Sequence, residues 1–163
     1  MSKDFPTRRV VAGVIFRDSE GKILIVERTY KTSWTIPGGI VEAMESPYEG
    51  AVREIKEELG LDRELGRLLC IDYVDDADDE RINFVFDGGM MKDEEAESIR
   101  LQASELASFR FCTVEEAQAL VSKSAAPRYP WIIKALADGT TLYLENGQPV
   151  SGSSSQEPES SSQ

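Results

Sequence analysis

Three glutamates in the middle of this 163-residue chain have a spacing that suits metal chemistry. Glu54, Glu57 and Glu58 stand at positions i, i+3 and i+4, so a helix would carry all three on one face. Like charges this close destabilise a helix by roughly a few tenths of a kcal/mol per pair, and a divalent cation would offset the repulsion. Mg²⁺ prefers oxygen ligands and binds through a few carboxylates together with substrate phosphates. The alternative is a solvated helix face, the usual setting of charged residues.

The chain contains no histidine, and this absence excludes several kinds of catalysis. A serine or cysteine nucleophile with an imidazole base is ruled out, and so is a zinc site that needs imidazole ligands. Any reaction must therefore use carboxylates, lysine, tyrosine, serine, cysteine or a metal ion held by oxygen atoms.

Residues 46–59 carry the signals of the helix that would position the three glutamates. Ser46 can cap the first turn, and Pro47 and Glu49 complete the N-terminal signal as first helical residue and capping-box partner. Gly60 predicts a left-handed stop. An apolar stripe recurs at helical spacing: Val52, Ile55 and Leu59. The acidic face is therefore expected roughly opposite the core.

Short strands and helices alternate along the rest of the chain. Strands are expected at residues 8–17, 22–27, 34–39, 67–74, 82–86 and 109–113, and helices are expected after Thr113 and over residues 130–137. The Asn146–Gly147 pair predicts a tight turn in a C-terminal hairpin over residues 140–150. This pattern predicts the α/β (α+β) class, with a mixed central β-sheet in an α/β/α sandwich.

Length and composition predict one domain over residues 1–150, with its core at about 8–138, because 163 residues of which 40% are hydrophobic can bury a core. Residues 151–163 contain no aromatic or aliphatic side chain and predict a disordered, serine-rich tail. Cys70 and Cys112 each lie in an apolar, strand-like stretch, which favours buried free thiols over a disulfide.

The net charge of −12 predicts repulsion of nucleic acids and anionic membranes, unless folding gathers the few cations into one patch. A small phosphorylated substrate is expected as the partner, with a cation between it and the protein. We recognise no signal peptide and no apolar run near the roughly 20 residues that cross a bilayer, so a cytoplasmic location is expected. A homodimer is left open. The acidic run 75–80 is interpreted as a solvated hairpin tip.

Read from Gly39, the sequence has the pattern G-x5-E-x7-R-E-I-x-E-E-x-G-L, and every specified position matches the Nudix box, which this segment resembles. A chance match is on the order of one in 10⁹ per starting position. The preceding Trp34-x-Ile36-Pro37-Gly38 is similar to the approach to the box in that family. The resemblance implies a Nudix-type α/β/α sandwich and a hydrolase that cleaves a phosphoanhydride (pyrophosphate) bond.

The resemblance also implies which residues carry the chemistry. Glu54, Glu57 and Glu58 would hold Mg²⁺, with Mn²⁺ as a substitute, and the carbonyl of Gly38 would add a ligand. Glu54 is favoured as the general base, or as the ligand that positions the attacking water.

Other box residues are expected to act through structure. Gly39 would let the backbone bend tightly, and Gly60 would end the helix. Glu45 and Arg53 would form an ion pair that ties the loop to the helix. Arg53 can equally orient Glu57 or Glu58, which would make it part of the catalytic machinery.

Three residues outside the box are further candidates. Glu105 stands six residues before an aromatic residue, where related enzymes often carry a catalytic glutamate. An exposed glutamate near a turn is the equal alternative for Glu105. Its rivals belong to an acidic loop that could fold over the site, although a solvated loop is the favoured interpretation: Asp93, Glu94, Glu95 and Glu97. Arg28 could meet a substrate phosphate and Trp34 could stack on a base, although a plain surface or core role is open for each.

Several functions compete with this prediction. The related isopentenyl-diphosphate isomerases need histidine ligands and are excluded. RNA 5′-end pyrophosphohydrolysis is disfavoured by the acidic composition. A catalytically silent Nudix domain that senses a nucleotide is disfavoured because all the glutamates of the box are present. The substrate stays open among ADP-ribose, oxidised deoxynucleoside triphosphates, nucleotide sugars and dinucleoside polyphosphates.

Overall fold

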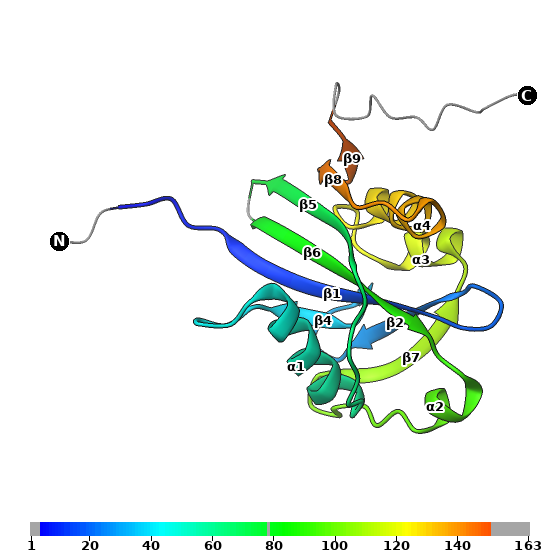
Figure 1. Cartoon of the computed structure of the whole chain (residues 1–163). Coiled ribbons are helices and arrows are strands. Elements are labelled where there is room, and N and C mark those ends of the chain that lie inside the picture. The colour runs from blue at the N-terminus through cyan, green and yellow to red at the C-terminus, as the bar shows by residue number, and fades with distance from the viewer. Residues whose placement is uncertain (1–3, 78, 151–163) are drawn as a thin grey trace, which may run out of the picture.

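A mixed β-sheet is the centre of the computed structural model, which describes residues 4–77 and 79–150 (Figure 1). The serine-rich tail predicted at 151–163 lies outside the described residues. The strands are β1 (Arg9–Arg17), β2 (Ile23–Arg28), β3 (Trp34–Thr35), β4 (Gly38–Ile40), β5 (Leu68–Asp76), β6 (Asp79–Met90), β7 (Leu106–Cys112), β8 (Leu142–Glu145) and β9 (Gln148–Pro149). The helices are α1 (Pro47–Leu59), α2 (Asp93–Glu97), α3 (Val114–Leu120), the 3₁₀ turn η1 (Ala126–Arg128) and α4 (Tyr129–Asp138).

The strand order is β3-β2-β1-β6-β5-β8-β9, with β4 paired to β1 and β7 paired to β2. The pairs β1–β6 and β5–β8 are parallel, and the others are antiparallel. Strands β1 and β2 pair at Arg17 and Ile23 and then separate, because β1 continues along β6 and β4 while β2 continues along β7 and β3. This separation opens the sheet where the glycines of β4 and the start of β3 lie.

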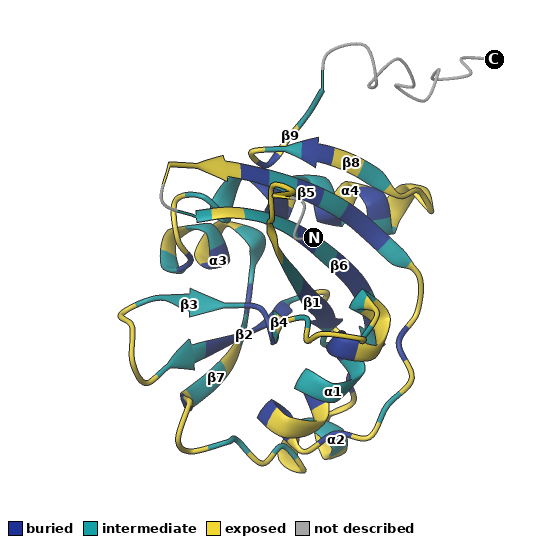
Figure 2. Ribbon diagram, turned by 90° about the vertical axis from the view of Figure 1, so that its left-hand side faces the viewer, coloured by how far each residue is buried: buried dark blue, intermediate teal, exposed yellow. Residues whose placement is uncertain are grey.

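Hydrophobic side chains fill both faces of the sheet, which makes the architecture an α/β/α sandwich. On one face, Ile55 and Leu59 of α1 pack with Val14 of β1. On the other, Ile132 of α4 packs with Ile15 of β1. Neighbouring residues of β1 therefore serve opposite cores, as expected for a strand covered on both sides. Figure 2 shows the same burial, concentrated along β1, β5 and β6. The predicted fold class is confirmed.

Local signals gave the ends of α1 correctly, whereas β6 and β7 begin three residues before their expected starts at 82 and 109. Ser46 caps α1, its Oγ accepting a hydrogen bond from the amide of Glu49 at 3.1 Å, and Gly60 ends the helix with a φ of 69°. The hairpin turn is confirmed at Asn146 and Gly147, whose φ values are 50° and 76°. The prediction of one strand over 34–39 was wrong, since β3 and β4 are separate strands that pair with different partners.

The two cysteines are buried free thiols, as predicted. Burial raises the pKa of Cys70 to about 12 and that of Cys112 to about 11, so both thiols stay protonated and unreactive at neutral pH. Among the described residues, none of the helices has the length and apolarity to cross a membrane.

A buried ion pair joins three parts of the chain that are distant in sequence. Arg128, at the end of η1, donates through Nε to Oδ2 of Asp72 on β5 at 2.8 Å. The other oxygen of Asp72 accepts from the amide of Gly147 in the terminal hairpin turn at 2.9 Å. Asp72 is fully buried and Arg128 is 5% exposed. The pair therefore fixes the hairpin and the start of α4 against the sheet.

Replacing Asp72 by Asn should destabilise the protein strongly. Removal of one partner of a buried pair leaves an uncompensated charge and costs about 3–5 kcal/mol. The matched control is Asp138→Asn, whose pair with Lys134 at 3.1 Å lies at the surface and is worth about 0–1 kcal/mol. Urea unfolding of both variants measures the difference, and equal losses would contradict the importance of the buried pair.

Candidate functional site

A cleft of about 600 Å³ opens where β1 and β2 separate. It collects charged side chains of both signs from distant segments. Its acidic residues are Glu42, Glu54, Glu58, Asp79 and Glu105, and its basic residues are Arg9, Arg28, Lys31, Arg81 and Arg128. Five of the 18 basic residues of this acidic chain thus border one cleft. Folding therefore gathers cations into one patch, which is the exception to the expected repulsion of anionic partners.

Arg53 organises the acidic side of the cleft. Its Nε and Nη2 donate to the two carboxylate oxygens of Glu45 at 2.7 and 3.0 Å, so the ion pair expected between loop and helix is present. Its Nη1 donates to Glu54 and to Glu57, each at 3.1 Å. Its Nη2 also donates to the carbonyl of Ile40 at 3.2 Å. One guanidinium therefore holds the strand β4, the following loop and two glutamates of α1 in a fixed arrangement.

The glycines of β4 let the carboxylates of α1 approach the backbone. The unusual backbone angle belongs to Gly38, with a φ of 147°, and not to Gly39. At Gly39 the requirement is space, because a Cβ there would lie 2.6 Å from Oε1 of Glu54. The amide of Gly38 donates to Oε2 of Glu58 at 3.1 Å. The expectation that Gly39 serves a tight bend is corrected accordingly.

Glu58 is a buried acid, which the sequence did not predict. It is 6% exposed and lies on the side of α1 that faces β4, next to the core residue Leu59. The acidic residues of α1 are therefore not all opposite the core. The pKa of Glu58 is raised to about 8, mainly by burial and also by the charges of Glu54 and Glu105, while the Gly38 amide and Arg28 oppose the shift. Burial also raises the pKa of Glu54, against the hydrogen bond from Arg53.

Most of the predicted site residues border this cleft: Gly38, Gly39, Glu54, Glu58, Glu105, Arg28 and Trp34. Glu57 does not border it. Its side chain is half exposed and bound to Arg53 at the rim. Glu45 and Gly60 also lie outside the cleft, the first bound to Arg53 and the second at the end of α1.

Glu105 reaches the cleft from a loop that the structure ties to both walls. The amide of Gln102 donates to the carbonyl of Glu58 at 3.0 Å, and the amide of Thr29 donates to the carbonyl of Glu105 at 2.9 Å. The rival acidic loop instead forms α2, where Glu95 pairs with Arg63 at 2.8 Å, and none of its residues borders the cleft. The geometry therefore favours Glu105 over its rivals.

Sequence reasoning missed the basic wall of the cleft. Arg81 lies on β6 and Arg128 at the end of η1, and no local spacing relates them. The acidic run 75–80 was interpreted as a solvated tip, yet Asp79 pairs with Arg81 and with Arg9. The sequence did contain one signal for this wall. Asp79 and Arg81 stand two residues apart at the start of a strand, and alternate residues of a strand share a face, so the two side chains could be expected to pair.

The oxygen-rich cleft fits a hard divalent cation in its chemistry. Burial and the charge of Glu105 raise the pKa of Glu54 and that of Glu58, and a cation would relieve this repulsion. No ready-made set of three acidic, cysteine or histidine ligands is found in the residues that the structure describes. Binding would therefore have to draw the carboxylates together, with Glu57 leaving Arg53.

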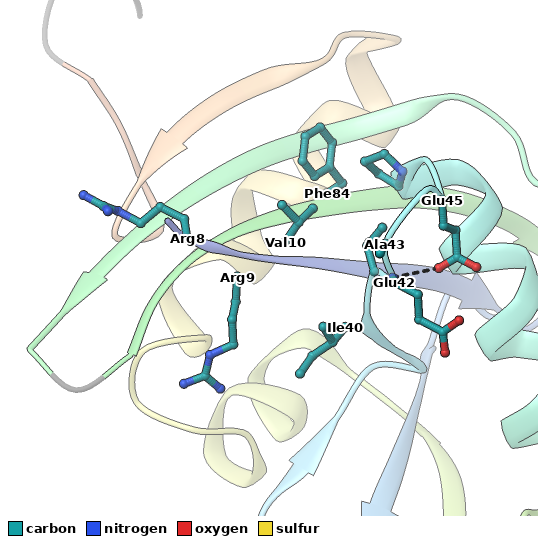
Figure 3. Close-up of a pocket in the computed structure, with 10 residues that line it drawn as sticks. Arg8, Arg9, Val10, Ile40, Glu42, Ala43, Glu45 and Phe84 are labelled. Atoms are coloured by element: carbon teal, nitrogen blue, oxygen red, sulfur yellow. Dashed lines mark hydrogen bonds between the residues drawn. The ribbon is translucent and has the colours of Figure 1, made fainter. Parts of the chain in front are cut away.

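A second hollow of about 480 Å³ lies beside the start of β1 and is lined by ten residues, including Val10, Ile40 and Phe84 (Figure 3). Arg8 and Arg9 lie at one end of it, and Glu42 and Glu45 at the other. Glu45 is already bound by Arg53 and by the amide of Glu42. This hollow lacks converging free carboxylates, so the cleft is the candidate site.

Comparisons with known proteins agree with this geometry. A family model described as the NUDIX domain matches residues 7–133. A Bacillus subtilis (strain 168) protein provisionally named as an ADP-ribose pyrophosphatase is 44% identical over 70 residues, which cover 42% of this chain and 33% of that protein. An RNA pyrophosphohydrolase of Hydrogenovibrio crunogenus is 41% identical over 59 residues, 34% of this chain and 36% of that protein. The matched segments thus span about a third of these relatives.

The fold is also that of solved structures. The MutT protein from Methanosarcina mazei Go1 superposes with a TM-score of 0.66 at 22% identity, covering 85% of this chain and 99% of that one. At 22% identity, this similarity shows a shared fold and not a shared activity.

Replacing Gly39 by Ala should displace Glu54 without unfolding the protein. The added Cβ would lie 2.6 Å from Oε1 of Glu54, and that side chain can rotate away. Misplacement of a site group by about 1 Å can cost about 10²-fold in activity. Titration calorimetry with Mg²⁺ should show weaker binding while the thermal unfolding midpoint changes little. Unchanged Mg²⁺ affinity would contradict this use of the glycine.

The metal-free protein should lose stability as the pH rises. The folded protein holds the Glu58 proton more tightly than the unfolded chain, since the pKa is raised from 4.5 to about 8. The resulting stabilisation is fully present below pH 4.5 and is lost as the pH rises through about 8. Urea unfolding in a chelator should show this decrease, and Glu58→Gln should flatten it. The control Glu49→Gln, at an exposed position of α1, should keep the decrease of stability with pH. A wild-type free energy of unfolding that does not change with pH would refute the raised pKa of Glu58.

Proposed function

The chain belongs to the NUDIX domain family, and from this premise we propose that it is a divalent-cation-dependent hydrolase of a phosphoanhydride bond. The substrate is a nucleoside diphosphate linked to another group, or a nucleoside triphosphate. The observation that carries the proposal is the convergence of Glu54, Glu58 and Glu105 in a cleft whose other wall is basic. Carboxylates suit a cation, and guanidinium groups suit phosphate oxygens.

In this proposal Glu54, Glu58 and Glu105 hold Mg²⁺, or Mn²⁺ in its place. Glu57 joins them from the rim, and the carbonyl of Gly38 is a further ligand. The cation, when bound, neutralises charge on the diphosphate and lowers the pKa of a water molecule. Deprotonation of Glu58, whose pKa is about 8 without a cation, accompanies that binding.

Glu54 is the proposed general base, or the ligand that positions the attacking water. Arg53 donates to its Oε1 at 3.1 Å and so fixes the orientation of the carboxylate. Arg53 acts here as a positioning residue, since it also holds Glu45 and Glu57. A base whose pKa is raised by burial accepts a proton from water more readily than an exposed carboxylate does.

Arg28 is proposed to bind a phosphate group of the substrate, and Trp34 is proposed to stack on its nucleobase. Arg28 borders the cleft and stabilises the charged form of Glu58, so it lies close to the reacting groups. Trp34 borders the cleft as well, although its ring also packs against the core and near Arg110. A small nucleotide is the expected partner, and a cytoplasmic location and a homodimer stay predictions.

The alternative is a catalytically silent domain that binds a nucleotide and hydrolyses nothing. The names of the relatives favour catalysis, because an ADP-ribose pyrophosphatase and an RNA pyrophosphohydrolase both cleave a pyrophosphate bond. The intact set of glutamates favours it for the same reason.

Product release from a substrate panel with Mg²⁺ tests the proposal. The panel contains ADP-ribose, oxidised deoxynucleoside triphosphates, nucleotide sugars and dinucleoside polyphosphates. Glu54→Gln should lower kcat by about 10²–10⁴-fold, the usual contribution of a general base. Glu58→Gln should weaken Mg²⁺ binding, whereas the exposed Glu49→Gln on the same helix should do neither. Nucleotide binding without product would establish the silent alternative, and a fully active Glu57→Gln would remove Glu57 from the metal site.

A further inference from the structure

The basic wall of the cleft contains a buried arginine whose hydrogen bonds are incomplete. Arg128 is 5% exposed and uses Nε for its bond to Asp72. Its Nη2 is buried, and no atom of the described residues accepts a hydrogen bond from it. A buried donor without an acceptor costs free energy, and native proteins rarely keep one without a reason. Since Arg128 borders the cleft, a ligand in the cleft is a source of the missing acceptor.

The ion pair with Asp72 alone does not explain this arrangement. Asp72 meets Nε on one edge of the guanidinium, and its second oxygen is occupied by the amide of Gly147. The Asp72 carboxylate therefore leaves Nη2 of Arg128 without a partner. Nη2 carries two of the five N–H donors of an arginine, in a planar fork that matches phosphate oxygens.

Arg81 is held close to Arg128 by two different partners. It pairs with Asp79, and its Nη2 donates to Oγ of Ser124 at 3.0 Å. Both Ser124 and Ser122 also border the cleft. The side chain of Arg81 is only 18% exposed, so two cations are kept in a poorly solvated wall with hydroxyl groups beside them.

The electrostatics of this wall favour the binding of an anion. Burial lowers the pKa of Arg81, and the charges of Arg128 and Arg28 lower it further, while Asp79 and Asp72 oppose the shift. Two further guanidinium groups therefore act on that of Arg81, and this set has three guanidinium groups against two carboxylates. In a chain with a net charge of −12, that local balance is positive by one charge.

The wall and the carboxylates reach the cleft from opposite faces of the sheet. Glu54 and Glu58 belong to α1, whereas Arg128 stands at the start of α4 and Ser124 in the loop that follows α3 (Figure 1). If the diphosphate of a substrate lies at the carboxylates, the group attached beyond that diphosphate would extend toward Arg81 and Arg128.

We propose that Arg81 and Arg128, with Ser124, form a second anion subsite that binds a phosphoryl group of the substrate beyond the diphosphate at the carboxylates. This inference rests on the proposed function and narrows its substrate class. Substrates with a third phosphoryl group, such as nucleoside triphosphates, are preferred over ADP-ribose, whose far end is an uncharged sugar. Arg81 and Arg128 are thereby specificity-determining residues.

Kinetics with two substrates of the same base test the subsite. Arg81→Gln should lower kcat/KM for ATP by about tenfold or more, because a hydrogen bond between charged groups is lost, and should change that for ADP-ribose by less than about twofold. Arg128→Lys keeps a cation beside Asp72 but loses the planar fork. It should likewise lower the ratio of kcat/KM for ATP to kcat/KM for ADP-ribose. The control Arg63→Gln removes an arginine paired outside the cleft and should leave the ratio unchanged. Equal losses for both substrates, or a larger loss for ADP-ribose, would overturn the subsite.

A binding measurement separates failure of the subsite from failure of the proposed function. In a chelator, inorganic tripolyphosphate should raise the thermal unfolding midpoint of the wild type and of Arg63→Gln, compared with sulfate at equal ionic strength. The rise should be lost in Arg81→Gln. A protein that hydrolyses no member of the panel but shows this pattern keeps the subsite and loses the hydrolase. An equal rise in Arg81→Gln, or none in the wild type, overturns the subsite whatever the activity.

Discussion

The candidate site depends on the hydrogen bonds that one guanidinium, that of Arg53, donates to three carboxylates and a backbone carbonyl. Its two-point contact with Glu45 ties the loop after β4 to α1, and the same group holds Glu54 and Glu57. A lysine has the charge but not the planar fork for this geometry. Because the bonds act together, the orientation of the carboxylates and the path of the loop cannot change independently.

A second constraint is the separation of β1 from β2. Each strand finds other partners beyond Arg17 and Ile23, and the space between them becomes the cleft. Side chains from both faces of the sandwich meet there, which is how an acidic protein presents a basic wall. The net charge of the chain therefore determines the electrostatic potential far from the protein. The potential inside the cleft depends on which charged side chains the fold brings together.

The sequence was sufficient for features that local chemistry fixes. The helix α1 is specified by Ser46, Pro47 and Gly60, and the box follows from spacing within the same segment. The burial of Glu58 could not be read locally, because it depends on the approach of β4, whose pairing with β1 is a long-range event. Arg128 is further from prediction still, since its partner Asp72 lies 56 residues away and its place at the cleft follows from the packing of α4 on the sheet.

The buried Glu58 and the contacts of Arg53 together determine what a cation must displace when it binds to the cluster. Glu58 has one backbone donor and a raised pKa, so the folded chain carries an acid that it would hold more easily in the neutral form. Glu54 and Glu57 instead share the single positive charge of Arg53 with Glu45. A cation entering the cleft must displace a proton from the first and compete with a guanidinium for the others. Both costs weaken the affinity for metal, and only the first of them depends on pH.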